Sequence, residues 1–330
     1  MIRIGLLGAG RIGQIHARTV SALDNVEIVA IHEPEDAAAA FVQAMTGAAR
    51  ATLLEIVDDP DIDAVVIASP TAQHAEQILE AAQGGKHIFC EKPIDLNMDK
   101  VRECVAAVEK AGVKMMIGFN RRFDLNFDAV KKNIRNGEIG EVELVQITSR
   151  DPEAPSISYL EKSGGIFVDM MIHDFDMARY LLDDEIVEVF ATGSVLTDPA
   201  IGKIGDLDTA TATLRSAKGR VAVITNSRRA SYGYDQRIEV HGSKGMVRAD
   251  NLRGTSVTLA NKQGYRSDPL LDFFMERYAI AYQAELQTFC KVVAGQVEVH
   301  PDHIDGLKAM ELAEAAQESF KKGCSIKIGK

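Results

Sequence analysis

Four ionisable side chains lie close together in a largely apolar segment, residues 164–182, with the sequence GGIFVDMMIHDFDMARYLL. They are Asp169, His173, Asp174 and Asp176, and burying such groups is costly unless they are paired or used. At about 100° per residue, a helix places Asp169, His173 and Asp176 on one stripe about 60° wide and turns Asp174 elsewhere. We therefore expect the stripe to line a cleft and Asp174 to be a surface or structural group.

The spacing of Asp169 and His173 suits acid–base chemistry. Residues four apart on a helix are close enough to pair, and a carboxylate beside an imidazole fixes its tautomer and stabilises its protonated form. His173 is therefore a candidate general base. Two alternatives stay open: a buried ion pair without chemistry, and a metal site. The metal site is less favoured, because the stripe holds one histidine and no second one four residues on.

A glycine-rich turn near the N-terminus has the spacing of a dinucleotide-binding loop. The letters GAGRIG lie between an expected strand (3–8) and an expected helix (12–23), which is the context that this pattern requires. The three glycines permit a tight turn, close approach of a pyrophosphate and close packing of helix on strand, and the helix N-terminus attracts phosphate. The alternative is a plain glycine turn. The residues expected to contact the cofactor are Gly8, Ala9, Gly10, Arg11, Ile12 and Gly13.

Glu33 follows the next strand, 20 residues after Gly13. An acidic residue at this distance is expected to hydrogen-bond the adenosine ribose. A carboxylate there also repels a 2′-phosphate, and no arginine follows at once. The sequence therefore favours NAD over NADP, the alternative being an ordinary surface glutamate.

Two further strands are followed by polar residues that we expect at the same sheet edge. The strand 87–90 leads into Glu91, Lys92 and Pro93, and ligands of open α/β sheets bind beyond the carboxyl ends of the strands. A lysine there can stabilise a developing alkoxide, although a solvated lysine in a turn is an equally good interpretation of this motif alone. The strand 64–69 adds candidates that line the cofactor groove: Ser69, Pro70 and His74.

The elements that must position these residues follow an alternating pattern over the first 120 residues. Continuous apolar strands separated by helices are typical of a doubly wound α/β fold with a parallel sheet. The remaining strands are expected at 26–32 and 114–119, and the remaining helices at 35–45, 72–85 and 97–112.

Beyond about residue 140 the strands alternate polar and apolar residues and are joined by short glycine turns, which predicts an antiparallel sheet. Helical patterns return at 124–136, 166–182, 275–294 and 302–321. We expect a dinucleotide-binding domain at 1–120 and a substrate-binding α+β domain at 121–330, with packing of the C-terminal helix back on the first domain left open.

The composition excludes several classes of protein. The net charge of −11 argues against nucleic acid and anionic membranes as partners. No apolar run approaches the roughly 18 residues of a membrane span, and no signal peptide is expected. The four cysteines lie apart without CxxC spacing, which favours a reducing, cytoplasmic compartment.

Taken in order, the motifs GAGRIG, EKP, GFNRRFD, GGIFVDMMIHDFDMARYLL and YGYDQRIEVHGSKG resemble the glucose–fructose oxidoreductase / inositol dehydrogenase (Gfo/Idh/MocA) family over essentially the whole chain. GFNRRFD, SRDP and SYGYDQR are most similar to its bacterial inositol 2-dehydrogenase branch. The resemblance implies an NAD-binding Rossmann domain and a second domain with a large, mostly antiparallel, open-faced sheet. It also implies a role in inositol catabolism, oxidising myo-inositol to its 2-keto product, and assembly into a homotetramer or homodimer.

The resemblance also implies roles for single residues. Lys92 matches the catalytic lysine, His173 the base and Asp169 the carboxylate partner. Positions that match substrate ligands are Arg122, Asp151, Asp176, Tyr234 and, more weakly, Tyr282, in addition to the catalytic three; Asn120 joins Glu91 and Lys92 among the expected cofactor contacts.

Other functions stay open at this point. Some inositol dehydrogenases read His-Arg-Asn-Pro where this chain has Ser149-Arg150-Asp151-Pro152, so a scyllo-inositol dehydrogenase or an aldose 1-dehydrogenase is an alternative. A non-enzymatic NAD(H)-binding redox sensor is an alternative of another class.

Overall fold

The computed structural model describes residues 1–329, which divide into two compact units. The first comprises Met1–Phe123 and Ile280–Lys308, and the second comprises Asp124–Ala279 and the chain from Ala309 onward. The first division lies close to the boundary expected near residue 120. Residues 280–308 belong to the first unit, although they follow the second one along the chain.

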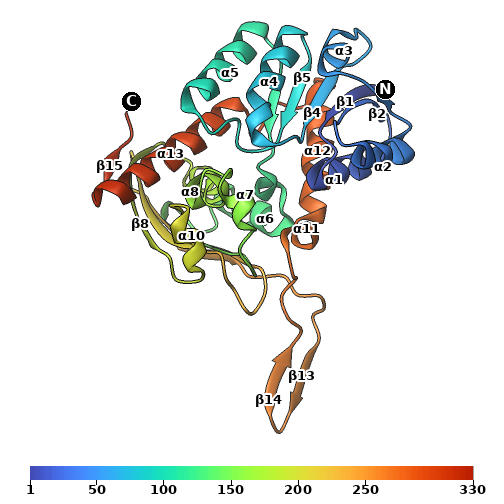
Figure 1. Cartoon of the computed structure of the whole chain (residues 1–330). Helices are drawn as coiled ribbons and strands as arrows, with labels where there is room; N and C mark the ends of the chain where they lie inside the picture. The colour runs from blue at the N-terminus through green and yellow to red at the C-terminus, as the bar shows by residue number, and fades with distance from the viewer. Residues whose placement is uncertain (330) are drawn as a thin grey trace. The chain divides into compact units, whose positions relative to one another are not determined.

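A six-stranded sheet forms the centre of the first unit (Figure 1). All its pairings are parallel, and its order β3-β2-β1-β4-β5-β6 is that of a doubly wound dinucleotide-binding fold, as predicted. The strands are β1 (Ile2–Leu7), β2 (Val26–His32), β3 (Ala49–Arg50), β4 (Ala64–Ile67), β5 (His87–Cys90) and β6 (Met115–Ile117). The helices are α1 (Arg11–Ser21), α2 (Asp36–Thr46), α3 (Leu53–Asp58), α4 (His74–Gln83), α5 (Met98–Ala111) and α12 (Ala279–Val293), with the 3-10 turns η1 (Thr71–Gln73) and η2 (Asn120–Phe123).

Helix α12 belongs to the first unit because its apolar side chains complete the core of that unit. Leu286 and Phe289 are fully buried in the same cluster as Ile4 and Phe89, and the rings of Phe89 and Phe289 meet edge to face at 5.7 Å. Burying side chains of this size stabilises a fold by about 1.5–3 kcal/mol each.

The second unit is built on a seven-stranded sheet of order β12-β11-β7-β10-β9-β8-β15. Its pairings are antiparallel except that β7 and β10 run parallel. The strands are β7 (Val142–Arg150), β8 (Ile186–Ser194), β9 (Thr209–Ser216), β10 (Val221–Ser227), β11 (Asp235–Gly242), β12 (Gly245–Ala249) and β15 (Ile326–Lys327). Helix α9 (Ile172–Leu182) packs on β7 and β10, which covers one face. The mostly antiparallel sheet was predicted.

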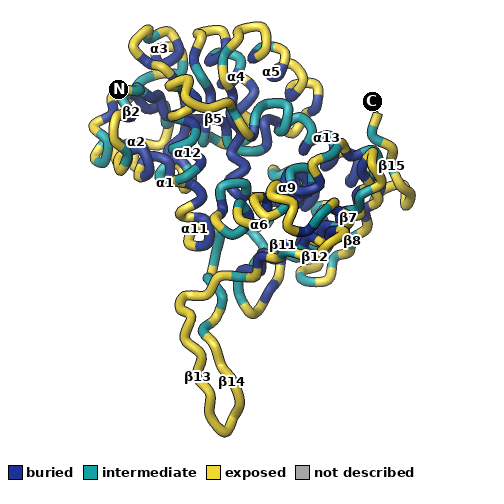
Figure 2. The backbone as a smooth tube through the Cα atoms, turned by 180° about the vertical axis from the view of Figure 1, so that it is seen from behind, coloured by how far each residue is buried: buried dark blue, intermediate teal, exposed yellow. Residues whose placement is uncertain are grey.

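The remaining elements are helices and one isolated hairpin. The helices are α6 (Leu125–Arg135), α7 (Ile157–Leu160), α8 (Ile166–Asp169), α10 (Pro199–Lys203), α11 (Phe274–Arg277) and α13 (His303–Lys322). Strands β13 (Thr258–Asn261) and β14 (Gly264–Ser267) pair only with each other, and every residue in them is exposed (Figure 2).

The prediction of one continuous helix over 166–182 was wrong. The segment forms two helices, α8 and α9, with Met170 and Met171 between them. The N–H of Met171 donates to the carbonyl of Ile166, five residues back, at 2.9 Å, which inserts an extra residue into the turn. A uniform 100° step therefore does not relate Asp169 to the side chains of α9.

Candidate active site

The glycine loop has the geometry that a bound pyrophosphate requires. Gly8 has φ +98°, and a Cβ there would lie 2.6 Å from the backbone nitrogen of Ser69. A Cβ on Gly13 would lie 2.1 Å from the carbonyl oxygen of Gly8, so only glycine lets α1 pack this close to the turn. A Cβ on Gly10 would meet nothing within 4 Å. The loop is therefore closely packed at Gly8 and Gly13 and open at Gly10, where a pyrophosphate would approach the N-terminus of α1.

Glu33 lies beside this loop. Its carboxylate accepts hydrogen bonds from the backbone N–H of Ala9 at 2.6 Å and of Glu35 at 2.9 Å. Arg50, on the neighbouring strand β3, donates to the carbonyl oxygens of Glu33 and Pro34, both at 2.9 Å. The acidic residue expected at the adenosine ribose thus joins the end of β2 to the phosphate loop.

The turn after β5 is held by contacts to its neighbours. The N–H of Glu91 donates to the carbonyl of Ile67 at 3.0 Å, and the Glu91 carboxylate lies 2.7 Å from Nε2 of His16. The buried ring of His74 lies between the carbonyls of Pro93, at 2.8 Å from Nδ1, and Ser69, at 2.9 Å from Nε2.

His74 therefore links two of the loops expected to line the cofactor groove. Carbonyl oxygens only accept, so both contacts are hydrogen bonds when both ring nitrogens carry protons. Burial lowers the pKa of His74, and the two carbonyls act in the opposite direction. Ser69 and Lys92, next to these hydrogen bonds, are both half-buried.

Asp169 has two donors of its own in the second unit. Tyr159 donates its hydroxyl to one carboxylate oxygen at 2.7 Å, and the fully buried Arg228 donates to the other at 3.1 Å. Both stabilise a negative charge on Asp169. Partial burial and the Asp169 carboxylate raise the pKa of Tyr159, so Tyr159 remains a donor at neutral pH.

The other ionisable residues of this segment differ in their surroundings. His173 is half-buried on the first turn of α9, and Asp176 is 1% exposed. Asp174 is fully buried; it accepts from the Ser149 hydroxyl at 2.6 Å and from the Asn226 amide at 2.8 Å. Asp174 is thus the structural group that the sequence allowed, and it anchors α9 to β7 and β10.

Three predicted ligands lie in the first unit. Arg122 forms a forked ion pair with Asp305 at 3.0 and 3.1 Å, which fixes the direction of its guanidinium. Asn120 is buried at the start of η2. Tyr282 is buried on α12, with its ring 6.1 Å from that of His16.

The remaining predicted ligands lie in the second unit. Asp151 follows β7, and its N–H donates to the carbonyl of Ser227 at 2.9 Å. Tyr234 is buried against Tyr278. Ser149 is fully buried, and its hydroxyl contacts Asp174 and Gln236. Two residues, Ser149 and Asp151, depart from the family pattern, and only Asp151 lies beyond the end of the strand.

Sequence reasoning missed Tyr159 and Arg228. A usable signal exists for Arg228, because it comes directly after β10 just as Asp151 comes after β7. These two strands are parallel, so their carboxyl ends meet at one edge. The expectation of antiparallel pairing hid this relation.

Comparison with known proteins defines the class. Residues 2–119 match the model of an oxidoreductase family with an NAD-binding Rossmann fold, and residues 127–248 match the GFO/IDH/MocA C-terminal domain. The first unit is therefore an NAD-binding domain of an oxidoreductase. The chain belongs to the Gfo/Idh/MocA family.

Three relatives show which branch of the family is similar. The chain is 51% identical over 327 residues to an inositol 2-dehydrogenase of Rhizobium meliloti, covering 99% of both chains. It is 43% identical, with a TM-score of 0.96, to the crystal structure of a myo-inositol dehydrogenase from Corynebacterium glutamicum, covering 100% of this chain and 99% of the other. A scyllo-inositol dehydrogenase from Lactobacillus casei with bound NAD(H) and scyllo-inositol is 32% identical, with a TM-score of 0.92, covering 99% of each.

Within residues 1–329, no helix has the length and apolar character that crossing a bilayer requires. All four cysteines are free.

Proposed function

We propose that this protein oxidises myo-inositol to 2-keto-myo-inositol (scyllo-inosose) with NAD as the acceptor. The observation that carries the proposal is similarity along the full chain to an inositol 2-dehydrogenase, at 51% identity. The half-buried Asp151 and the buried Asp176 support a neutral polyol, because each carboxylate accepts hydrogen bonds from hydroxyl groups and would repel an anionic acid.

Three residues carry the proposed chemistry. His173 takes the proton of the reacting hydroxyl, as a general base. Asp169, held by Tyr159 and Arg228, orients the base and stabilises its protonated form. Lys92 offsets the negative charge that develops on the same oxygen. When bound, the nicotinamide ring supplies the hydride acceptor. The proposed ligands of the other hydroxyls are Arg122, Asp151, Asp176, Tyr234 and Tyr282.

The test is a steady-state assay of NADH formation with the wild type, Lys92→Ala and His173→Ala. Loss of a general base lowers the rate by about 10²–10⁴-fold, and we expect a loss of this order in kcat/KM for both variants. Matched controls are Lys110→Ala and His241→Ala, which remove exposed residues of the same types. Near-full kcat/KM in either active-site variant would show that its role is wrong.

A second candidate is oxidation of scyllo-inositol, favoured by the similarity to the scyllo-inositol dehydrogenase of Lactobacillus casei. Parallel assays with myo-inositol, scyllo-inositol and aldoses separate these substrates. A protein that binds NAD and oxidises none of them would instead support the redox-sensor alternative.

We further propose a cytoplasmic enzyme that assembles as a homotetramer or homodimer. The four free cysteines support a reducing compartment. The sheet of the second unit supports assembly through the face that α9 does not cover. On β10, the half-buried Val221, Val223 and Thr225 alternate with fully buried residues.

A further inference from the structure

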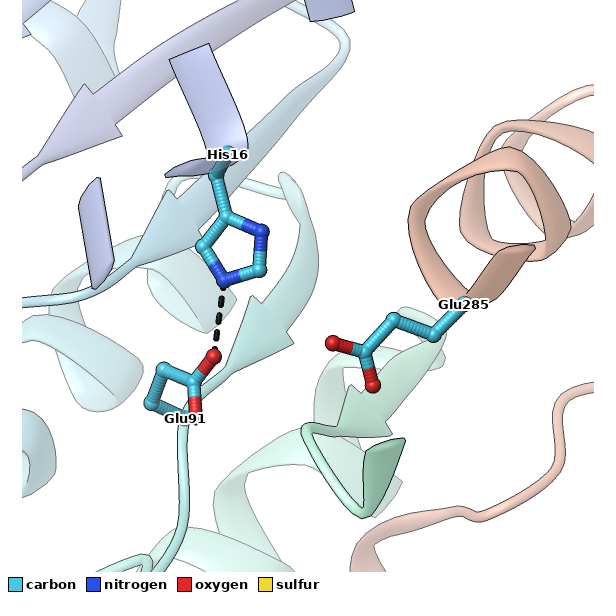
Figure 3. Close-up of side chains that lie close together, drawn as sticks. All are labelled: His16, Glu91 and Glu285. Carbon is cyan, nitrogen blue, oxygen red and sulfur yellow. Dashed lines mark hydrogen bonds and ion pairs between the residues drawn. The ribbon is translucent and has the colours of Figure 1, made fainter. Parts of the chain in front are cut away.

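Three ionisable side chains that have no step in the proposed chemistry meet inside the first unit (Figure 3). They are His16 on α1, Glu91 after β5 and Glu285 on α12, and one polar atom from each lies within 4.8 Å of the others. His16 and Glu285 are 0% exposed, and the Glu91 side chain is 13% exposed. We call these three residues the buried cluster.

Glu285 is the unusual member of the buried cluster. Neither of its carboxyl oxygens has a hydrogen-bond partner, and the carboxyl group points towards His16 and Glu91 (Figure 3). An ionised carboxylate in such a place is costly. Burial, and then the negative charge of Glu91, raise the pKa of Glu285 well above its ordinary value.

The groups around Glu285 come from three elements. His16 faces it from α1 and Glu91 from the turn after β5. The ring of His16 lies 6.1 Å from that of Tyr282, on α12 itself, and 5.0 Å from the apolar ring of Phe89. With both glutamates ionised, one imidazolium could balance only one of the two charges.

Either a proton or a cation could neutralise the excess charge, and the geometry favours the proton. Nε2 of His16 and Oε1 of Glu91 are already in direct contact at 2.7 Å. A metal ion bound by both residues would have to replace this hydrogen bond. A proton on Glu285 leaves it intact.

We propose that Glu285 is held as a neutral carboxylic acid beside the His16–Glu91 pair, and that the buried cluster fixes the Glu91 carboxylate and hence the turn that carries Lys92. Glu285 is then a positioning residue. Only the last link, from the turn to catalysis, rests on the proposed function of Lys92.

The packing around Glu91 explains why its position responds to Glu285. A Cβ on Gly118 would lie 2.9 Å from Oε2 of Glu91, so the carboxylate is confined on that side. Its backbone N–H is bound to Ile67. A second negative charge on Glu285 would repel a carboxylate with little room to move, and Lys92 is the next residue along the chain.

The protonation state is tested by infrared spectroscopy at neutral pH on the whole protein, without substrate. We expect a carbonyl band of a protonated carboxylic acid that is present in the wild type, absent in Glu285→Gln, and retained in Glu298→Gln, which changes an exposed glutamate of the same unit. An identical carboxylic-acid band in all three proteins would overturn the proposal. So would one equivalent of a divalent metal ion, found by elemental analysis in the wild type and lost in Glu285→Gln.

The positioning role is tested by kinetics with NAD and myo-inositol. Glu285→Gln keeps a neutral polar group beside Glu91 and should keep kcat within about threefold. Glu285→Leu removes the polar group that faces Glu91 and should lower kcat by roughly tenfold or more with little change in KM, as expected for a misplaced catalytic group. Circular dichroism confirms that each variant folds. Full kcat in Glu285→Leu, or equal losses in both variants, would overturn the positioning role. Inactivity of the wild type on every polyol would instead refute the proposed function and leave the infrared result standing.

Discussion

At the scale of single residues, one carboxylate controls the expected choice of cofactor. Glu33 accepts from the N–H of Ala9 in the phosphate loop, and Arg50 is bound to the carbonyl oxygen of Glu33. A negative and a positive side chain thus lie together where the adenosine ribose is expected. The carboxylate disfavours a 2′-phosphate, and the guanidinium is the group that could bind one.

We predict that Glu33→Ala relaxes the preference for NAD. The kcat/KM ratio of NADP to NAD should rise by roughly tenfold or more, because removal of one repulsive charge contact changes binding by about 1–2 kcal/mol. Arg50→Gln in the Glu33→Ala background should reverse most of the gain. An unchanged ratio in Glu33→Ala would contradict the assignment of this residue.

The raised pKa of Glu285 leads to a prediction on how the stability of the protein changes with pH. Its pKa is raised in the folded protein, so between its ordinary value near 4.5 and the raised folded value the unfolded chain binds fewer protons than the folded one. Stability from this group is therefore lost as pH rises. Glu285→Gln should melt at a higher temperature than the wild type, with a gap that widens from pH 5 to pH 8. A gap that does not vary with pH would indicate an ionised Glu285.

At the scale of elements, the helical segment from 166 to 182 shows where periodicity works and where it stops. Its apolar residues are core, as their pattern predicts. The break at Met170 and Met171 is marked by a hydrogen bond from Met171 to Ile166, which hydropathy does not encode. Asp169 is held by Tyr159, from helix α7, and by Arg228, which follows β10.

We predict that Asp174→Ala lowers the free energy of unfolding by about 2–4 kcal/mol, because it removes the acceptor of the buried Asn226 amide and one of the two acceptors of the Ser149 hydroxyl. Urea denaturation of the second unit, followed by circular dichroism, measures the change. The exposed Asp272→Ala is the matched control and should fall within about 0.5 kcal/mol of the wild type. Equal midpoints for the two variants would refute the anchoring role of Asp174.

At the scale of the whole molecule, the sheet of the second unit has helix α9 on one face. Along β10, half-buried residues alternate with fully buried ones, and the half-buried residues belong to the other face. Large open sheets with apolar residues tend to be covered by a partner. This is the surface through which we propose that the subunits assemble.

We predict that Val223→Glu, at the middle of β10, weakens assembly by placing a charge in the buried interface. Sedimentation velocity should show a shift from tetramer or dimer towards smaller species. Val297→Glu, at an exposed valine of the first unit, is the matched control for the added charge. An unchanged distribution for Val223→Glu would exclude this face as the interface.

The sequence by itself determined those features that depend on neighbours along the chain. The parallel βα units, the glycine loop with its following Glu33, and the Lys92 turn at a strand end all arise from local periodicity and turn chemistry. Only the tertiary structure decided which distant groups meet: Arg228 with Asp169, α12 with the core of the first unit, and Glu285 with His16 and Glu91. The physical reason is that burial and charge pairing are set by contacts between residues far apart in sequence. The same glutamate is an ordinary surface anion in one fold and a neutral buried acid in another.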